Sequence, residues 1–261
     1  MQHFIWNVDP VLISLGPLTI HWYGALFASS IFAGLYYMKW IFAQEKQNVE
    51  LLDNLLVYVV VGIIVGARLA HCFFYDPQYY LANPLKIIAI WEGGLASHGG
   101  GLGAIIAGYL FSRKYAVNVI WLLDRLAIAT ALFGIFVRSA NFVNAEILGK
   151  ATDVPWGVIF ARVDNVVRHP AQLYEAIAYC LIFISLTIIY RTTKAKQYQG
   201  MLLGLFLIMT FTARFIIEFF KQQQAAYQIE AALNTGQMLS IPFFLVGVAL
   251  IVRAFKRTNQ Q

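Results

Sequence analysis

Four arginines, Arg68, Arg125, Arg138 and Arg214, lie inside or at the edge of long apolar runs of the sequence, where a charged side chain needs a structural or chemical reason. Arg138 is followed by Asn141, Asn144 and Glu146 at the end of one run, and Arg214 lies inside another. A cation near the centre of a bilayer costs at least about 2.5 kcal/mol by insertion scales. Guanidinium groups have planar, forked donors that match phosphate oxygens, so these residues suit an anion site.

The surroundings of the arginines allow two interpretations. Arg214 and Glu218 are four residues apart and share a helix face, which favours an ion pair with a purely structural role. Arg138 and Arg168, however, are expected at the same membrane depth as Arg214. Three guanidinium groups at one depth favour the anion-site interpretation. Arg125 differs because it follows Asp124 near the start of a helix, which predicts a local structural role with a snorkelling side chain.

A glycine-rich segment contains the candidate proton-transfer residue. His98 follows Ser97 and precedes three glycines, where the backbone can approach a ligand closely. Its imidazole can exchange a proton near neutral pH, although a lone histidine is also common as a structural residue. Gly99, Gly103 and Ala107 recur every four residues, so close helix packing explains part of the glycine content.

The elements that must position these side chains are membrane helices. The chain is 60% hydrophobic and 12% charged, far more apolar than a soluble domain of 261 residues. We expect one polytopic domain over residues 1–261, all-α, with seven transmembrane helices. They are expected near residues 19–42, 52–75, 95–112, 119–138, 173–190, 200–220 and 238–254.

The distribution of basic residues predicts the orientation. The connectors at residues 43–51, 113–118 and 191–199, and the tail after residue 254, carry eight of the 19 lysines and arginines, and Lys39 and Arg253 lie at the neighbouring helix ends. The positive-inside rule places them in the cytoplasm, with the N-terminus outside and the C-terminus inside. The polar residues of the candidate site then lie toward the outer face. His21 and Trp22 are expected to be interfacial anchors, whereas Tyr23 could face inward.

Several other chemistries lack support in the sequence. The net charge of +6 is spread over connectors and forms no basic stripe, so no nucleic-acid partner is expected. No motif for zinc, a serine nucleophile or a dinucleotide is present. Cys72 and Cys180 lie in apolar runs and are expected to be core residues. A transporter or lipid-binding protein is the main alternative to an enzyme, and a structural subunit would leave the arginines unexplained.

Four motifs together resemble those of the prolipoprotein diacylglyceryl transferase family. They are Ser97-His-Gly-Gly, Arg138-x-x-Asn-Phe-x-Asn-x-Glu, Arg168-His-Pro-x-Gln-Leu-Tyr-Glu and Ala213-Arg-Phe-x-x-Glu-Phe-Phe. The resemblance runs nearly from end to end, and includes Ile20-x-Trp-Tyr-Gly, Gly66-x-Arg-Leu-x-His and Thr152-Asp-x-Pro-Trp-Gly in the family's order.

The resemblance implies a reaction, its partners and a location. A diacylglyceryl group would move from phosphatidylglycerol to the lipobox cysteine thiol of a prolipoprotein, forming a thioether and releasing glycerol phosphate. No metal or organic cofactor is implied, and the location would be the bacterial inner membrane. By position in the motifs, His98, Arg138, Arg214 and Glu218 would act in catalysis. Substrate binding would involve Arg138 again, Arg168, and the residues Tyr23, Asn141, Asn144, Glu146 and Gly149.

Some positions depart from the family pattern. Val137, Ala140 and Ala145 stand where glycine is usual, and Lys150 replaces a usual arginine. Thr210 stands where a tyrosine implicated in function is common, so this chain has no phenol at that position. The charged and amide groups of the motifs are intact.

Overall fold

The computed structural model describes residues 3–16, 18–222 and 233–258, which group into two compact units. Unit 1 comprises Met1–Tyr37 and Asp124–Gln261, and unit 2 comprises Met38–Leu123. The side chains of Leu18, Ser97, His98, Arg257 and Thr258 lie outside the description. The expectation of one polytopic domain stays a prediction.

Most described residues are helical, as the sequence predicts. The long helices are α1 (Trp22–Gln44), α2 (Leu51–Phe74), α4 (Ser97–Lys114), α5 (Val119–Val143), α6 (Ala171–Thr192), α7 (Met201–Ile217) and α8 (Thr235–Thr258). Short helical segments are α3 (Pro77–Ala82), η1 (Pro84–Ile88), η2 (Ile90–Glu92), η3 (Lys194–Gln197) and η4 (Glu218–Phe220).

Six helices within the described chain are long and apolar enough to cross a membrane, and the protein is a mainly helical membrane protein. They are α1, α2, α5, α6, α7 continued through η4, and α8. The seventh predicted span corresponds to α4, which has 18 residues and is not among the six. Four glycines between residues 99 and 103 lower its hydropathy, so its membrane crossing stays a prediction.

Five short strands were not predicted from the sequence, and all belong to unit 1. Strand β1 (Phe4–Trp6) pairs in parallel with β4 (Val158–Phe160), which pairs antiparallel with β5 (Val167–Arg168). Strands β2 (Val11–Leu15) and β3 (Leu18–His21) form a hairpin. Residues 19–21, predicted to begin the first span, are therefore extended. Strands of two to five residues are too short to give a clear alternating pattern.

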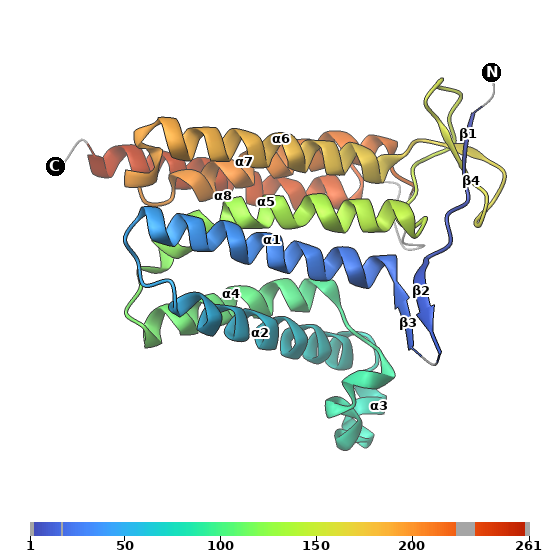
Figure 1. Cartoon of the computed structure of the whole chain (residues 1–261), viewed down its shortest axis with the longest axis horizontal. Helices are drawn as coiled ribbons and strands as arrows, with labels where there is room; N and C mark the ends of the chain where they lie inside the picture. The colour runs from blue at the N-terminus through green and yellow to red at the C-terminus, as the bar shows by residue number, and fades with distance from the viewer. Residues whose placement is uncertain (1–2, 17, 223–232, 259–261) are drawn as a thin grey trace. The chain divides into compact units, whose positions relative to one another are not determined.

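The helices of unit 1 run side by side, with the β1–β4 pair near one end of α5 and α6 (Figure 1). At the opposite end of α5, Asp124 accepts hydrogen bonds from the backbone nitrogens of Gly200 (2.7 Å) and Leu203 (2.8 Å), which begin α7. Arg125 donates to the carbonyl of Lys196 at 2.9 Å. The structural role predicted for Arg125 is confirmed, but its side chain is buried in protein and does not snorkel.

Unit 2 is built on close packing of α2 against α4. A Cβ added at Gly62 would lie 2.6 Å from both the Ala107 Cβ and the Gly103 carbonyl oxygen. Gly99 and Gly66 approach each other in the same way. The packing interpretation of the glycine repeat is therefore confirmed, because backbone fills the space that side chains would need.

Candidate functional site

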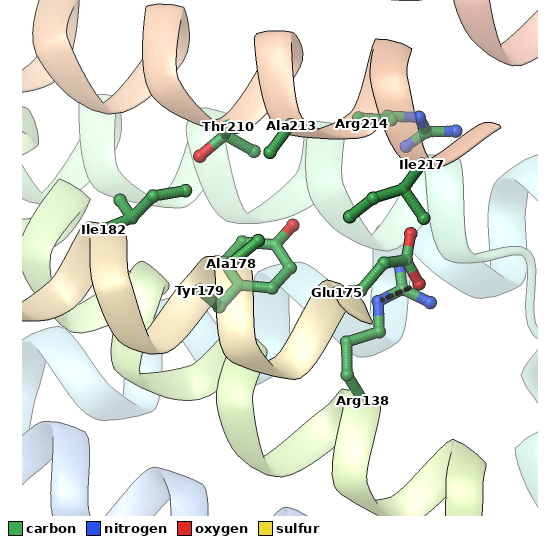
Figure 2. A pocket seen from close by; sticks show the side chains of 9 residues that line it. All are labelled: Arg138, Glu175, Ala178, Tyr179, Ile182, Thr210, Ala213, Arg214 and Ile217. Atoms are coloured by element: carbon green, nitrogen blue, oxygen red, sulfur yellow. Dashed lines mark ion pairs between the residues drawn. The ribbon is translucent and has the colours of Figure 1, made fainter. Parts of the chain in front are cut away.

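A polar pocket lies within unit 1, between α6 and α7, with Arg138 of α5 at its edge (Figure 2). It encloses about 280 Å³ of empty space, including the space at its mouth. The lining residues are Arg138, Glu175, Ala178, Tyr179, Ile182, Thr210, Ala213, Arg214 and Ile217. The structure thus brings together two of the four residues predicted to act in catalysis.

Arg138 is held by a carboxylate that the sequence did not place in the site. Its Nε lies 3.1 Å from Oε2 of Glu175, and its Nη1 donates to Oδ1 of Asn141 at 3.3 Å. The Arg138 side chain is 19% exposed and that of Glu175 is 6% exposed. A paired guanidinium that keeps some exposure can still contact a ligand in the pocket.

Glu146 connects the amides at the end of α5. Asn141 donates to its Oε2 at 2.9 Å and Asn144 to its Oε1 at 3.1 Å. Ala145 and Ile147 on either side of Glu146 have φ values of 56° and 55°, in the left-handed region that alanine and isoleucine rarely adopt. The predicted grouping of Arg138, the two asparagines and Glu146 at a helix end is present, on a strained backbone.

Lys221 joins two acidic residues beside the pocket. Its Nζ lies 3.2 Å from Oε1 of Glu175 and 3.5 Å from Oε2 of Glu218. A continuous series of charges therefore runs from Arg138 through Glu175 and Lys221 to Glu218. Glu175 and Lys221 were missed as site residues; a carboxylate in the first turns of an apolar helix was the available signal.

The ion pair expected between Arg214 and Glu218 is absent from the described residues, so that prediction is wrong. Helix α7 ends at Ile217, and Glu218 begins the tighter turn η4, which changes the spacing that an α-helix gives to residues four apart. Glu218 instead faces Lys221 and lies against Gly236, where a Cβ would meet its carboxylate at 2.5 Å.

Arg214 is left with free hydrogen-bonding capacity. Its Nε is buried and has no hydrogen-bond partner in the described structure. Figure 2 shows its guanidinium near Ile217 at the charged end of the pocket. An unmatched charged donor in a buried position is unfavourable unless a ligand supplies an acceptor.

Arg168 lies near the site but is occupied by protein acceptors. It bonds to Asp164 at 2.6 Å, to the carbonyl of Gly149 at 3.3 Å and to Gln222 at 3.1 Å. The hydrogen bonds from Arg168 to Asp164 lower the pKa of the Asp164 carboxyl below its ordinary value. Arg168 does not line the pocket, so contact with a substrate stays a prediction for this residue.

Three further predicted residues have clear positions. Tyr23, in the first turn of α1, lies within electrostatic range of Glu146 and Arg138. Gly149 forms a backbone bridge with Lys221, and a Cβ there would collide with the His169 carbonyl. His98 is the second residue of α4 in unit 2, but its side chain lies outside the description, so its role stays a prediction.

The chemistry available in the pocket is anion binding. Arg138 and Arg214 line the pocket with the apolar side chains of Ile182 and Ile217, and Lys221 beside it pairs with Glu175 and Glu218. Fixed cations act more strongly on a bound anion in such surroundings than in water. Within residues 3–16, 18–222 and 233–258, no cluster of three His, Cys, Asp or Glu suits a metal ion.

Known proteins match this chain over almost its whole length. The family described as prolipoprotein diacylglyceryl transferase matches residues 10–253. A phosphatidylglycerol–prolipoprotein diacylglyceryl transferase of Tolumonas auensis is 54% identical, covering 96% of this chain and 97% of the relative. Proteins with the same name from Chloroherpeton thalassium (46% identical; 99% and 97% covered) and Porphyromonas gingivalis (44%; 98% and 96%) are also similar. The matches include all the helices that form the pocket.

Proposed function

The chain belongs to the prolipoprotein diacylglyceryl transferase family, and on that premise we propose that the pocket between α6 and α7 binds the phosphate of its lipid substrate. The protein transfers a diacylglyceryl group from phosphatidylglycerol to a prolipoprotein, the first step of lipoprotein maturation. The observation that carries the proposal is the buried, unpartnered Nε of Arg214 in a pocket that Arg138 also lines.

The reaction requires an anion to be stabilised as one bond replaces another. The lipobox cysteine attacks as a thiolate at the glyceryl carbon of phosphatidylglycerol. A carbon–sulfur bond forms, the carbon–oxygen bond to phosphate breaks, and glycerol phosphate leaves with the bonding electrons. Arg138 and Arg214 stabilise the charge that gathers on the leaving phosphate, because their donors are fixed before the reaction begins.

The acidic residues and Lys221 keep those donors in place. Glu175 holds Arg138 at 3.1 Å and is itself held by Lys221. Glu218 acts on the same network through Lys221, because it forms no pair with Arg214. We therefore assign Glu175, Lys221 and Glu218 as positioning residues that act through the arginines.

The remaining predicted residues fall into two groups. Tyr23, Asn141 and Asn144 donate hydrogen bonds to the lipid headgroup or the peptide backbone, and Glu146 orders the two amides. Gly149 and Arg168 shape the loop beside the pocket. We propose His98 as the acceptor of the thiol proton, with a thiolate stabilised by a nearby arginine, without a dedicated base, as the alternative, and we propose no metal or organic cofactor.

The family and the apolar helices indicate a bacterial integral membrane protein. We propose that it lies in the inner membrane and that α4 is its seventh span, since α4 packs along α2. Seven spans place the N-terminus outside and the C-terminus in the cytoplasm. The pocket then lies toward the outer face, because the basic connector 191–199 belongs to the opposite helix ends.

The test is transfer of diacylglyceryl from phosphatidylglycerol to a lipobox peptide by purified protein, with the thioether product measured by mass spectrometry. Arg138→Ala should lower kcat/KM by about 10²–10³-fold or more, as for loss of a preorganised donor. Arg253→Ala is the matched control, because Arg253 is an exposed arginine near the end of α8.

The transfer assay has three outcomes that lead to different conclusions. Product from the wild type and from Arg253→Ala, with almost none from folded Arg138→Ala, supports the anion site. Equal turnover by all three proteins would place the phosphate elsewhere. Lipid binding without any product from the wild type would instead favour a lipid-binding or transport protein.

A further inference from the structure

The pocket has an ordered composition along its two main helices. Glu175, Ala178, Tyr179 and Ile182 form one face of α6, and Thr210, Ala213, Arg214 and Ile217 form the facing side of α7. Figure 2 shows the charged groups at one end, Thr210 and Ile182 at the other, and Tyr179 between them. The Tyr179 phenol therefore lies between the charged end of the pocket and the end where the Thr210 hydroxyl lies with Ile182.

Thr210 carries the unexplained polar atom at the end of the pocket opposite the charges. The residue is 8% exposed, and its Oγ1 is buried without a hydrogen-bond partner in the described structure. Threonine in a helix usually bonds back to a carbonyl of the preceding turn, as Thr130 and Thr192 do here. A buried hydroxyl without such a bond is costly unless a ligand supplies the partner.

Tyr179 is fixed by tight packing against α5. A Cβ added at Gly134 would lie 2.7 Å from the Tyr179 ring, so glycine at 134 makes room for the aromatic side chain. Its phenol lines the pocket, where its oxygen accepts a hydrogen bond from Arg138 and its hydrogen remains available for a ligand, and it lies within electrostatic range of Arg214. Tyr179 follows Glu175 by four positions on α6, a rise of about 6 Å along the helix axis.

We propose that Tyr179 and Thr210 donate hydrogen bonds to an ester carbonyl of the diacylglyceryl group. In a phospholipid the ester carbonyls lie between the phosphate and the acyl chains. The pocket has a related order: the arginines lie at one end, the Tyr179 phenol follows, and the Thr210 hydroxyl lies with the apolar side chain of Ile182 at the other end. This inference rests on the proposed phosphate site, and it makes the two residues specificity determinants for ester-linked lipid.

The test compares two donor lipids that differ only at these carbonyls. Transfer to a lipobox peptide is measured with diacyl phosphatidylglycerol and with its dialkyl ether analogue, in the same detergent. The readout is the ratio of kcat/KM for ester over ether donor. Wild type should prefer the ester, and Thr210→Val or Tyr179→Phe should each reduce that ratio by roughly threefold to tenfold. Thr210→Ser should keep the preference, because it keeps the hydroxyl.

A matched pair of hydroxyls provides the control. Tyr37 and Thr187 bond to each other at 2.9 Å in unit 1, and neither lines the pocket. Tyr37→Phe and Thr187→Val therefore remove the same chemical groups without touching the proposed contact. The ester preference should be unchanged in both.

The outcomes separate this inference from the proposed function. No transfer from diacyl phosphatidylglycerol by wild type contradicts the function itself. Transfer from it with equal use of the ether lipid overturns only the role of the hydroxyls. An ester preference that survives in both Thr210→Val and Tyr179→Phe overturns it as well. If Tyr179→Phe does not fold, Thr210→Val and Thr210→Ser still decide the outcome.

Discussion

Buried arginines in the two units have the same appearance in the sequence but different surroundings in the structure. Arg68 of unit 2 is 3% exposed, and its guanidinium donates to the carbonyls of Lys86, Ile87, Gly93 and Gly94. Arg214 of unit 1 has a buried Nε without a partner. A guanidinium saturated by backbone carbonyls holds a loop, whereas an unsaturated one facing a pocket is available to an anion.

The backbone loops beside Arg68 and beside the pocket of unit 1 also differ, in the type of residue that adopts a left-handed φ. Near Arg68, the residues with φ in the left-handed region are Gly93 and Gly94, at 85° and 76°, where glycine carries no steric penalty. Beside the pocket of unit 1 the corresponding residues are Ala145 and Ile147. The loop around Arg68 is relaxed, and the loop around Glu146 retains strain of the kind found at functional sites.

The largest expected effect comes from exchanging the two arginines for neutral residues. Arg214→Ala should lower kcat/KM by about 10²–10³-fold with little change in thermal stability. Arg68→Met should instead destabilise the protein by roughly 3 kcal/mol, because several buried carbonyls lose a charged donor. Turnover assays and thermal unfolding in detergent measure both. A folded, stable Arg68→Met protein without activity would remove the distinction.

A second effect concerns the charges that hold Arg138. Glu175→Gln and Lys221→Met should each reduce kcat/KM, because each single change leaves the other charge buried and unpaired. The double variant should lose less activation free energy than the sum of the two single losses. A double-mutant cycle should give a coupling energy of about 1–3 kcal/mol. Additive losses would show that the ion pair has no part in positioning Arg138.

A third effect extends the comparison to Arg168 of unit 1, whose guanidinium, like that of Arg68, donates hydrogen bonds to several protein acceptors. The Arg168 guanidinium lowers the pKa of Asp164, so this pair stabilises the folded protein above the ordinary aspartate pKa of about 4. This stabilising contribution is lost as the pH falls through the lowered pKa that Asp164 has in the folded protein. Between pH 6 and 3, the unfolding temperature should fall more steeply for wild type than for Asp164→Asn. Parallel curves would contradict this role for Arg168.

The smallest effect tests the strain in the loop around Glu146. Ala145→Gly removes the Cβ that disfavours a left-handed φ, and should stabilise the protein by up to about 1 kcal/mol. Thermal unfolding measures the change. Ala140→Gly, inside α5, is the control and should destabilise by a similar amount. A loss of stability in Ala145→Gly would mean that the alanine methyl group makes a compensating contact.

Part of the site follows from sequence spacing alone. Arg138, Asn141 and Glu146 come together because residues three apart share a helix face and the helix ends a few residues later. Glycines recurring every four residues predict close helix packing at α4, and Asp124 next to Arg125 predicts a local structural role; the structure supplies α2 as the packing partner. The family motifs identify the reaction for the same reason, since they preserve residue types at fixed spacing.

The partners of the charged groups depend on contacts between helices that are distant in the sequence. Glu175 pairs with Arg138 across 37 residues of chain and with Lys221 across 46 residues, so local periodicity could not identify either pair. The turn from α7 into η4 sends Glu218 to Lys221 and leaves Arg214 unpaired. The sequence by itself determined the helices, their hydropathy and the residues available for chemistry. Tertiary packing decided which charges are neutralised inside the protein and which remain free for a ligand, because that choice depends on distances of a few ångströms between separate helices.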